Sequence, residues 1–227
     1  MKRKPLVIII DALLVIAVLA NLILATDFTS GTSMDPTLKD GQPLLVMRPT
    51  AMKVLSVFGV KYNRGDIVIA ENDKDLNNLT KGELIVKRII GTPKDTVAIG
   101  RKQVFINGKA LSEPYVVHKM DNLYYSYGGL ADGGRVFNDP SYTAKTKLTS
   151  NQYFLMGDNR PASADSRWIG PVKQSQLKGK VMVKLPFNAK NLAGRLMGQI
   201  LVYTPLLLLL LSFLVSYLYD RRANKTA

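Results

Sequence analysis

The chain has 227 residues, enough for one globular domain with short appendages, and its 31 Lys and Arg against 17 Asp and Glu give a formal net charge of +14. No cysteine is present and His118 is the only histidine, which excludes disulfides, thiol catalysis and cysteine- or histidine-rich metal sites. The positive charge suits either nucleic acid or an anionic membrane as partner. Because two long apolar runs occur and no zinc-finger spacing or RNA-binding motif does, we expect a membrane surface, and no nucleic acid, metal or cofactor.

The first predicted element is an apolar helix over residues 6–25, preceded by the basic residues Lys2, Arg3 and Lys4. At about 1.5 Å per residue, its length covers a bilayer core of roughly 30 Å. We therefore predict a membrane-spanning anchor, with Asp11 near its basic end. A cleaved signal peptide is the alternative, although the apolar core of such a peptide usually has only about 7 to 15 residues.

The following segment, residues 26–195, is predicted to be a mainly β domain. Short runs rich in β-branched and aromatic residues, separated by turns, are typical of strands. The predicted strands are residues 44–47, 66–70, 84–90, 96–99, 104–106, 153–156 and 180–185. Asn107 and Gly108 predict a tight hairpin, because such a turn needs positive φ at both central residues. No helical period of useful length occurs here, and residues 121–150 are expected to form an exposed excursion.

The first candidate for chemistry is Ser33, which lies in the run GTSMDPTL at residues 31–38, close behind the predicted anchor. A turn with a linker serine explains this segment equally well, because serine, glycine and proline are common in loops. Ser33 is therefore a candidate nucleophile only if a base accompanies it.

The second candidate lies in the predicted strand LIVKRIIG at residues 84–91, which is apolar on both faces but carries adjacent cations at Lys87 and Arg88. One interpretation is that both cations reach solvent at a sheet edge. The other is that one is buried for catalysis, and because arginine keeps its proton in proteins, only Lys87 then serves as a base. Burial beside Ile85 and Ile89 lowers the pKa of a lysine from about 10.4 toward about 7 or 8, where base catalysis is efficient.

A third segment, MGDNRPASADSR at residues 156–167, gathers hydroxyls, carboxylates and guanidiniums behind a predicted strand. A solvated loop explains each of these side chains individually. Alternatively, Gly157 admits a close backbone approach and Asp165 lies near Arg167, which favours a rigid polar platform beside a catalytic group. A Ser-His-Asp triad is not expected, because His118, the one histidine of the sequence, has no nucleophile signal nearby.

The last predicted element is a second apolar run at residues 196–219, long enough to span a membrane, with a buried helix of a soluble protein as the alternative. Basic residues lie outside both spans, including Arg221 and Arg222, so the positive-inside rule places both termini in the cytoplasm. The predicted organisation is a cytoplasmic N-terminus at residues 1–5, an anchor at 6–25, an extracytoplasmic domain at 26–195 with a cap-like insertion at about 103–150, a second transmembrane helix at 196–219 and a cytoplasmic tail at 220–227.

Together, the three candidate segments resemble the type I signal peptidases. The resemblance rests on the patterns Ser-Met-x-Pro-Thr-Leu, Lys-Arg-x-x-Gly-x-Pro-x-Asp and Gly-Asp-Asn-Arg-x-x-Ser-x-Asp-Ser-Arg, in this order after an apolar anchor. It covers residues 31–38, 65–70, 87–95 and 157–172. It implies a catalytic domain of coiled antiparallel β-sheets, here with one transmembrane helix at each end.

The resemblance also implies a role for each matched residue. Ser33 is expected to be the acylated nucleophile, Lys87 the base, and Ser163 the residue that orients the lysine amine. Residues expected to brace the site through ion pairs are Arg88, Asp158, Asp165 and Arg167. Residues expected to line the apolar pockets for small substrate side chains are Met34, Leu38, Ile85 and Val86. Gly31 stands where some family members have a serine that donates to the oxyanion, so backbone donors are expected instead.

The function implied by the resemblance is removal of N-terminal signal peptides from exported preproteins, after small residues at Ala-x-Ala sites. The expected enzyme is a monomer in the plasma membrane of a bacterium, with signal peptides and the lipid bilayer as partners. One alternative is a signal-peptidase-like assembly partner for surface pilins, which is expected to have lost the serine and lysine. Another is a self-cleaving repressor, which two membrane spans and the absence of a helix-turn-helix segment argue against.

Overall fold

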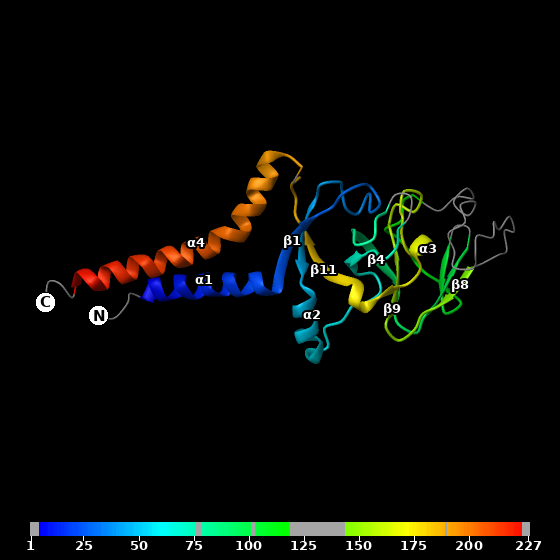
Figure 1. The fold of residues 1–227 in the computed structure, drawn as a ribbon, viewed down its shortest axis with the longest axis horizontal. Coiled ribbons are helices and arrows are strands. Elements are labelled where there is room, and N and C mark those ends of the chain that lie inside the picture. Colours follow the sequence, from blue (N-terminus) through cyan, green and yellow to red (C-terminus); the bar gives the residue numbers. More distant parts are fainter. Residues whose placement is uncertain (1–4, 76–78, 101–102, 119–143, 189, 224–227) are drawn as a thin grey trace.

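The computed structural model describes residues 5–75, 79–100, 103–118, 144–188 and 190–223. Within these residues, two antiparallel sheets form the domain and two long helices extend from it on one side (Figure 1). The predicted mainly β fold is therefore confirmed. Residues 119–143, about half of the predicted cap-like insertion, lie outside the described residues, as do residues 1–4 and 224–227 at the two ends.

The large sheet contains seven strands in the order β1-β2-β11-β3-β4-β9-β10, each antiparallel to its neighbours. The strands are β1 (Leu24–Phe28), β2 (Pro43–Met47), β3 (Ile67–Glu71), β4 (Leu84–Gly91), β9 (Gln152–Met156), β10 (Val172–Lys173) and β11 (Leu177–Lys184). Because β4 lies between β3 and β9, Lys87 pairs with Val68 and Arg88 pairs with Met156. Both cations of the sequence motif thus lie inside the sheet, away from its edges.

The small sheet has the strand order β7-β6-β5-β8 and lies at the end of the domain away from the long helices (Figure 1). Its strands are β5 (Thr96–Ile99), β6 (Val104–Ile106), β7 (Lys109–Ala110) and β8 (Ala144–Lys147). Asn107 and Gly108 have φ angles of 51° and 81° and join β6 to β7. The hairpin predicted from these two residues is therefore confirmed.

The long helices are α1 (Pro5–Ile23) and α4 (Leu192–Ala223), which run side by side with the two chain termini at the same end (Figure 1). Ser212 on α4 donates a hydrogen bond to the Asp11 carboxylate on α1. Among the described residues, no helix combines the length and the hydropathy of a membrane span. The two apolar runs thus form helices, while their passage through a membrane stays a prediction.

Three local expectations from the sequence are wrong. Residues 121–150 were expected to form an exposed excursion, but residues 144–147 form β8, which pairs with β5, and Leu148 is buried in the core. Residues 24 and 25 were assigned to the apolar helix, but they begin β1, because Leu24 and Ala25 pair with Met47 and Val46 of β2. The expectation of no helix within the domain misses α2 (Pro49–Leu55), which starts on a proline whose fixed φ suits a first helical turn. The remaining short elements are η1 (Ser56–Phe58), α3 (Ser166–Ile169) and η3 (Gln174–Gln176).

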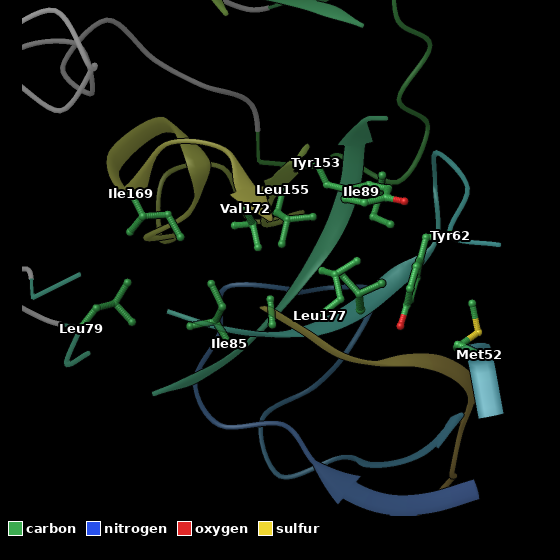
Figure 2. Packing of buried hydrophobic residues seen from close by; sticks show 12 residues of the cluster. Met52, Tyr62, Leu79, Ile85, Ile89, Tyr153, Leu155, Ile169, Val172 and Leu177 are labelled. Atoms are coloured by element: carbon green, nitrogen blue, oxygen red, sulfur yellow. The ribbon is translucent and has the colours of Figure 1, made fainter. Parts of the chain in front are cut away.

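Three clusters of buried apolar side chains hold these elements together. The first includes Ile85 and Ile89 of β4, and Figure 2 shows it in close-up. The second joins the small sheet to the large one through Phe154 and its neighbours on β5 and β6. The third packs Met34 and Leu38, from the loop after β1, against β2 and β3. This third cluster fixes the loop that carries Ser33.

Candidate active site

Ser33 lies in the loop between β1 and β2, and two features hold that loop in place. Its flanking side chains Met34 and Leu38 are buried in the third apolar cluster. On the other side, the Asn159 backbone N–H donates to the Ser33 carbonyl oxygen at 3.0 Å, and the Asn159 side-chain amide donates to the Thr32 carbonyl at 3.1 Å. Ser33 is therefore fixed between the core and the segment that follows β9.

The structure brings Lys87 to Ser33, although 54 positions separate them in sequence. The Lys87 Nζ lies 2.9 Å from the Ser33 Oγ and also donates to the Val86 carbonyl oxygen at 2.9 Å. Lys87 is only 4% exposed. The sequence left open whether the cations of β4 reach solvent or one of them is buried. In the structure, Lys87 is buried.

Burial lowers the pKa of Lys87 to about 8 from its ordinary value of 10.5. The negative charge of Asp165 opposes this shift, and the positive charge of Arg167 adds to it. The amine therefore has a substantial neutral fraction at mildly alkaline pH, and a neutral amine is a competent proton acceptor.

Residues 157–167, which we call the platform, lie behind this pair and are organised by Asp165. Its carboxylate accepts hydrogen bonds from the Ser163 hydroxyl at 2.7 Å, the Gly157 N–H at 3.0 Å, and the Arg167 Nε and Nη2 at 2.8 Å each. Although burial on its own raises the pKa of Asp165, the Arg167 guanidinium and these hydrogen bonds hold it below the ordinary value. Among the described hydrogen bonds, Ser163 thus reaches Asp165, and a direct contact with Lys87 stays a prediction.

Gly157 is required by packing. A Cβ built on it would lie 2.3 Å from the Ser163 Oγ and 2.4 Å from the Ser33 carbonyl oxygen, closer than Cβ atoms in real proteins come. The platform backbone therefore approaches the Ser33 loop more closely than any side chain at position 157 permits. The sequence interpretation of Gly157 as a point of close approach agrees with this geometry.

The predicted ion pairs form. Arg88 donates from Nε and Nη2 to the two Asp158 oxygens at 2.8 and 2.6 Å, and from Nη1 to the Gly65 carbonyl at 2.7 Å. Asp158 is completely buried, so this two-pronged contact compensates a charge that water does not reach. The pair connects β4 to the platform.

The four residues expected to line the substrate pockets do not form one group. Met34 and Leu38 are buried in the third apolar cluster, and the partly buried Val86 packs against them. Ile85 belongs to the first cluster instead. A lining role for these residues stays a prediction.

Sequence reasoning missed three residues that contact the bracing groups directly or through one another. Glu113 forms an ion pair with Arg160 of the platform, and the Arg88 guanidinium carbon lies 4.0 Å from the centre of the Tyr115 ring. Arg160 belongs to the third motif and was open to recognition, whereas Glu113 and Tyr115 follow the β6–β7 hairpin without any local signal. Within the described part of the chain, no three acidic or histidine side chains are grouped to hold a metal ion.

The comparisons with known proteins agree with this geometry. A family model described as signal peptidase, peptidase S26, matches residues 3–185. The chain belongs to this signal peptidase family. It is 36% identical over 193 residues to signal peptidase I of Bacillus licheniformis, covering 82% of this chain and 92% of that relative. It is 32% identical over 197 residues to signal peptidase IB of Staphylococcus aureus strain Mu50, covering 83% and 93%.

A solved signal peptidase I from Enterococcus faecalis V583 is 28% identical, with a TM-score of 0.38, and the match covers 54% of this chain and 97% of that one. Membership of the signal peptidase family confirms the resemblance seen in the sequence motifs. It also confirms the expectation of a serine endopeptidase that removes signal peptides, and the assembly partner without activity is not favoured. All of α4 lies beyond the residues that the family model matches.

Proposed function

We propose that Ser33 is the nucleophile and Lys87 the general base of this signal peptidase. The observation that carries the proposal is the 2.9 Å approach of the Lys87 Nζ to the Ser33 Oγ, with the lysine almost completely buried. In acylation, neutral Lys87 takes the hydroxyl proton as Oγ bonds to the scissile carbonyl carbon. The proton then passes to the leaving amine as the peptide C–N bond breaks.

Deacylation uses the same pair in reverse. Lys87 takes a proton from water as the water oxygen attacks the acyl carbon, and Ser33 leaves with that proton. The Ser33 backbone N–H is proposed to stabilise the oxyanion, since electrostatic stabilisation of this kind is usually the largest single term. Gly31 has a φ of 84° and open space around its Cβ position, and it supplies no side-chain donor.

The remaining residues are proposed to position this pair and the substrate. Ser163 orients the Lys87 amine, supported by its place between Asp165 and Gly157. The ion pairs of Arg88 with Asp158 and of Arg167 with Asp165 brace the site. The apolar side chains of Met34, Leu38, Ile85 and Val86 are proposed to favour small residues before the cut.

We also propose that α1 and α4 anchor the enzyme, as a monomer, in the plasma membrane of a bacterium, with the β domain outside and both termini in the cytoplasm. Their adjacent course and the shared end of the two termini support this arrangement. An anchor places the enzyme beside signal peptides that are themselves held in the bilayer, which raises their effective concentration.

The chemistry is tested with the detergent-solubilised full chain and a precursor that carries an Ala-x-Ala site. Ser33→Ala and Lys87→Ala are each expected to lower the cleavage rate by about 10⁴-fold or more, because the two residues act as a unit. Ser30→Ala and Lys145→Ala, which change exposed residues of the same types, serve as matched controls. Mass spectrometry of the product identifies the bond cut. Undiminished cleavage by Ser33→Ala refutes the proposed mechanism.

The topology is tested separately by cysteine labelling, which the cysteine-free sequence makes direct. In intact cells, a membrane-impermeant maleimide is expected to label Lys145→Cys, whereas Ala227→Cys should react only after permeabilisation. Labelling of both positions in intact cells contradicts a cytoplasmic C-terminus.

A further inference from the structure

Residues 111–115, which we call the strap, run from the small sheet to the platform. The strap continues the β6–β7 hairpin, since the Leu111 N–H donates to the Val104 carbonyl at 2.8 Å and Gln103 Nε2 donates to the Leu111 carbonyl at 2.6 Å. Leu111 and Tyr115 also pack against the second apolar cluster. The strap is therefore held firmly on the side of the small sheet.

Glu113 connects the strap to the platform through Arg160. Arg160 is 1% exposed, and its Nη2 lies 2.5 Å from one Glu113 oxygen while its Nη1 lies 3.3 Å from the other. The Arg160 Nε donates to the Gly157 carbonyl oxygen at 3.0 Å. Glu113 is thus the charge partner of a buried arginine that holds the platform at Gly157.

Tyr115 makes the second connection, through Arg88. The Arg88 guanidinium carbon lies 4.0 Å from the centre of the Tyr115 ring, a cation–π distance. The same guanidinium holds Asp158 by two hydrogen bonds. The Tyr115 hydroxyl donates to Glu113 at 3.3 Å, and burial, together with the charge of Glu113, raises the pKa of Tyr115 and keeps this donor protonated.

Both connections end on Gly157 and Asp158, where the platform meets the nucleophile loop. Gly157 has no room for a Cβ beside the Ser33 carbonyl, and Asn159 donates to that same oxygen. A platform that moves at residues 157–159 therefore moves Ser33 relative to Lys87. Displacements of about 1 Å in a catalytic pair cost up to about 100-fold in rate.

We propose that Glu113 and Tyr115 are positioning residues for the peptidase reaction, which act through Arg160 and Arg88 to hold the platform and keep Ser33 aligned with Lys87. The inference rests on the proposed roles of Ser33 and Lys87. Neither residue is assigned a contact with the substrate, so their loss acts on the chemical step.

The first test is Glu113→Gln in the full chain, with a precursor peptide as substrate. We expect kcat to fall by about tenfold or more with KM changed by less than about twofold, because alignment is lost and substrate contacts are kept. The acidic limb of the pH–rate profile, expected near the Lys87 pKa of about 8, should move to higher pH as water reaches the amine. Glu71→Gln, which removes an equivalent charge from an exposed ion pair with Lys178, should change neither quantity.

The second test separates the ring of Tyr115 from its hydroxyl. Tyr115→Phe keeps the ring against Arg88 and should retain kcat within about threefold, whereas Tyr115→Leu should lose about tenfold. If Glu113 acts through Arg160, the double variant Glu113→Gln/Arg160→Gln should be no slower than Arg160→Gln alone.

The outcomes separate cleanly. Unchanged kcat and an unmoved pH profile in folded Glu113→Gln overturn the inference, as does an effect on KM alone. If Glu113→Gln fails to fold, the Tyr115 pair decides, and equal activity of the Phe and Leu variants overturns the inference. Ser33→Ala is assayed in parallel, and activity in that variant refutes the proposed mechanism itself, a result distinct from failure of the strap.

Discussion

The ion pairs of the platform and the ion pair between β11 and β3 have the same chemistry in opposite surroundings. The carboxylates of Asp158 and Asp165 are completely buried, and their arginine partners are nearly so. Between β11 and β3, by contrast, Lys178 and Glu71 pair with side chains 40% and 41% exposed. Water and salt screen the exposed pair, whereas the buried charges depend on their partners alone.

Exposed and buried ion pairs therefore have different roles in this protein. The exposed pairs contribute little to the free energy of unfolding and act mainly on solubility. The buried pairs fix position, because any geometry that separates the partners leaves an uncompensated charge in the core. Burial lowers the pKa of a lysine such as Lys87 into the range that is useful for base catalysis.

The largest effect on stability is expected where one partner of a buried pair is removed. Asp158→Ala leaves the Arg88 guanidinium facing Gly65 and Tyr115 without a carboxylate, and the free energy of unfolding should fall by about 3–5 kcal/mol. Chemical denaturation of the variant and of the wild type measures this difference in the free energy of unfolding. The double variant Arg88→Met/Asp158→Leu should lose less than Asp158→Ala, since it leaves no orphaned charge. If Asp158→Ala lowers the free energy of unfolding by less than about 1 kcal/mol, the buried Arg88–Asp158 pair contributes no more to stability than an exposed pair does.

Removing the buried amine itself should stabilise the protein. Below pH 8 folded Lys87 is charged in the core, so Lys87→Met should raise the free energy of unfolding by about 3 kcal/mol, the value that corresponds to a pKa of about 8 against 10.5. Between pH 8 and 10.5 the unfolded state binds a proton that the folded state does not, so wild-type stability rises with pH. The advantage of Lys87→Met should therefore vanish above about pH 10.5.

This prediction is checked by denaturation of both proteins from pH 7 to pH 11, because ionisations that they share cancel in the difference. Lys145→Met, which removes an exposed lysine from β8, corrects for the loss of one cation. A constant difference between wild type and Lys87→Met over this range would show that Lys87 is not kept uncharged by the fold.

Sequence reasoning located Lys87 because a cation inside an apolar strand conflicts with the local pattern, and the conflict marked a function. The strands themselves were predicted from short runs rich in β-branched and aromatic residues, and β5 and β6 have the predicted bounds. β1 was hidden because its first residues continue the apolar run of α1, and only pairing with β2 distinguishes strand from helix there. Local sequence pattern therefore identifies a helix or strand correctly only where the segment's own residues, and not its pairing with another strand, determine which of the two it forms.

Glu113 and Tyr115 were beyond reach for a related reason. Their local sequence has the composition of an exposed turn. Their contacts with Arg160 and Arg88 form only when the hairpin folds against the platform and β4. Motif reasoning found the arginines and carboxylates that lie close together in sequence, such as Asp165 and Arg167. Partners separated by 47 positions, as Glu113 and Arg160 are, require the tertiary structure.

A smaller effect is expected from one methyl group in the platform. Gly157→Ala forces a Cβ against the Ser33 carbonyl and the Ser163 hydroxyl, so the free energy of unfolding should fall by about 1–3 kcal/mol. Cleavage should slow by up to about 100-fold, because the nucleophile loop is displaced. Gly100→Ala is the matched control, since its Cβ would meet its nearest neighbours at 3.3 Å. Equal activity of the two variants would show that the platform yields without moving Ser33.

The smallest effect is expected at the exposed pair. Glu71→Gln and Lys178→Met should each change the free energy of unfolding by less than about 1 kcal/mol, and a double-mutant cycle should give a coupling of about 0.2–1 kcal/mol. Salt separates this pair from the platform most sharply: raising the ionic strength from 0.01 M to 1 M shortens the screening length from about 30 Å to about 3 Å. The exposed coupling should then disappear, while the loss in Asp158→Ala should persist. A salt-resistant coupling between Glu71 and Lys178 would mean that exposure does not separate the two kinds of ion pair in this protein.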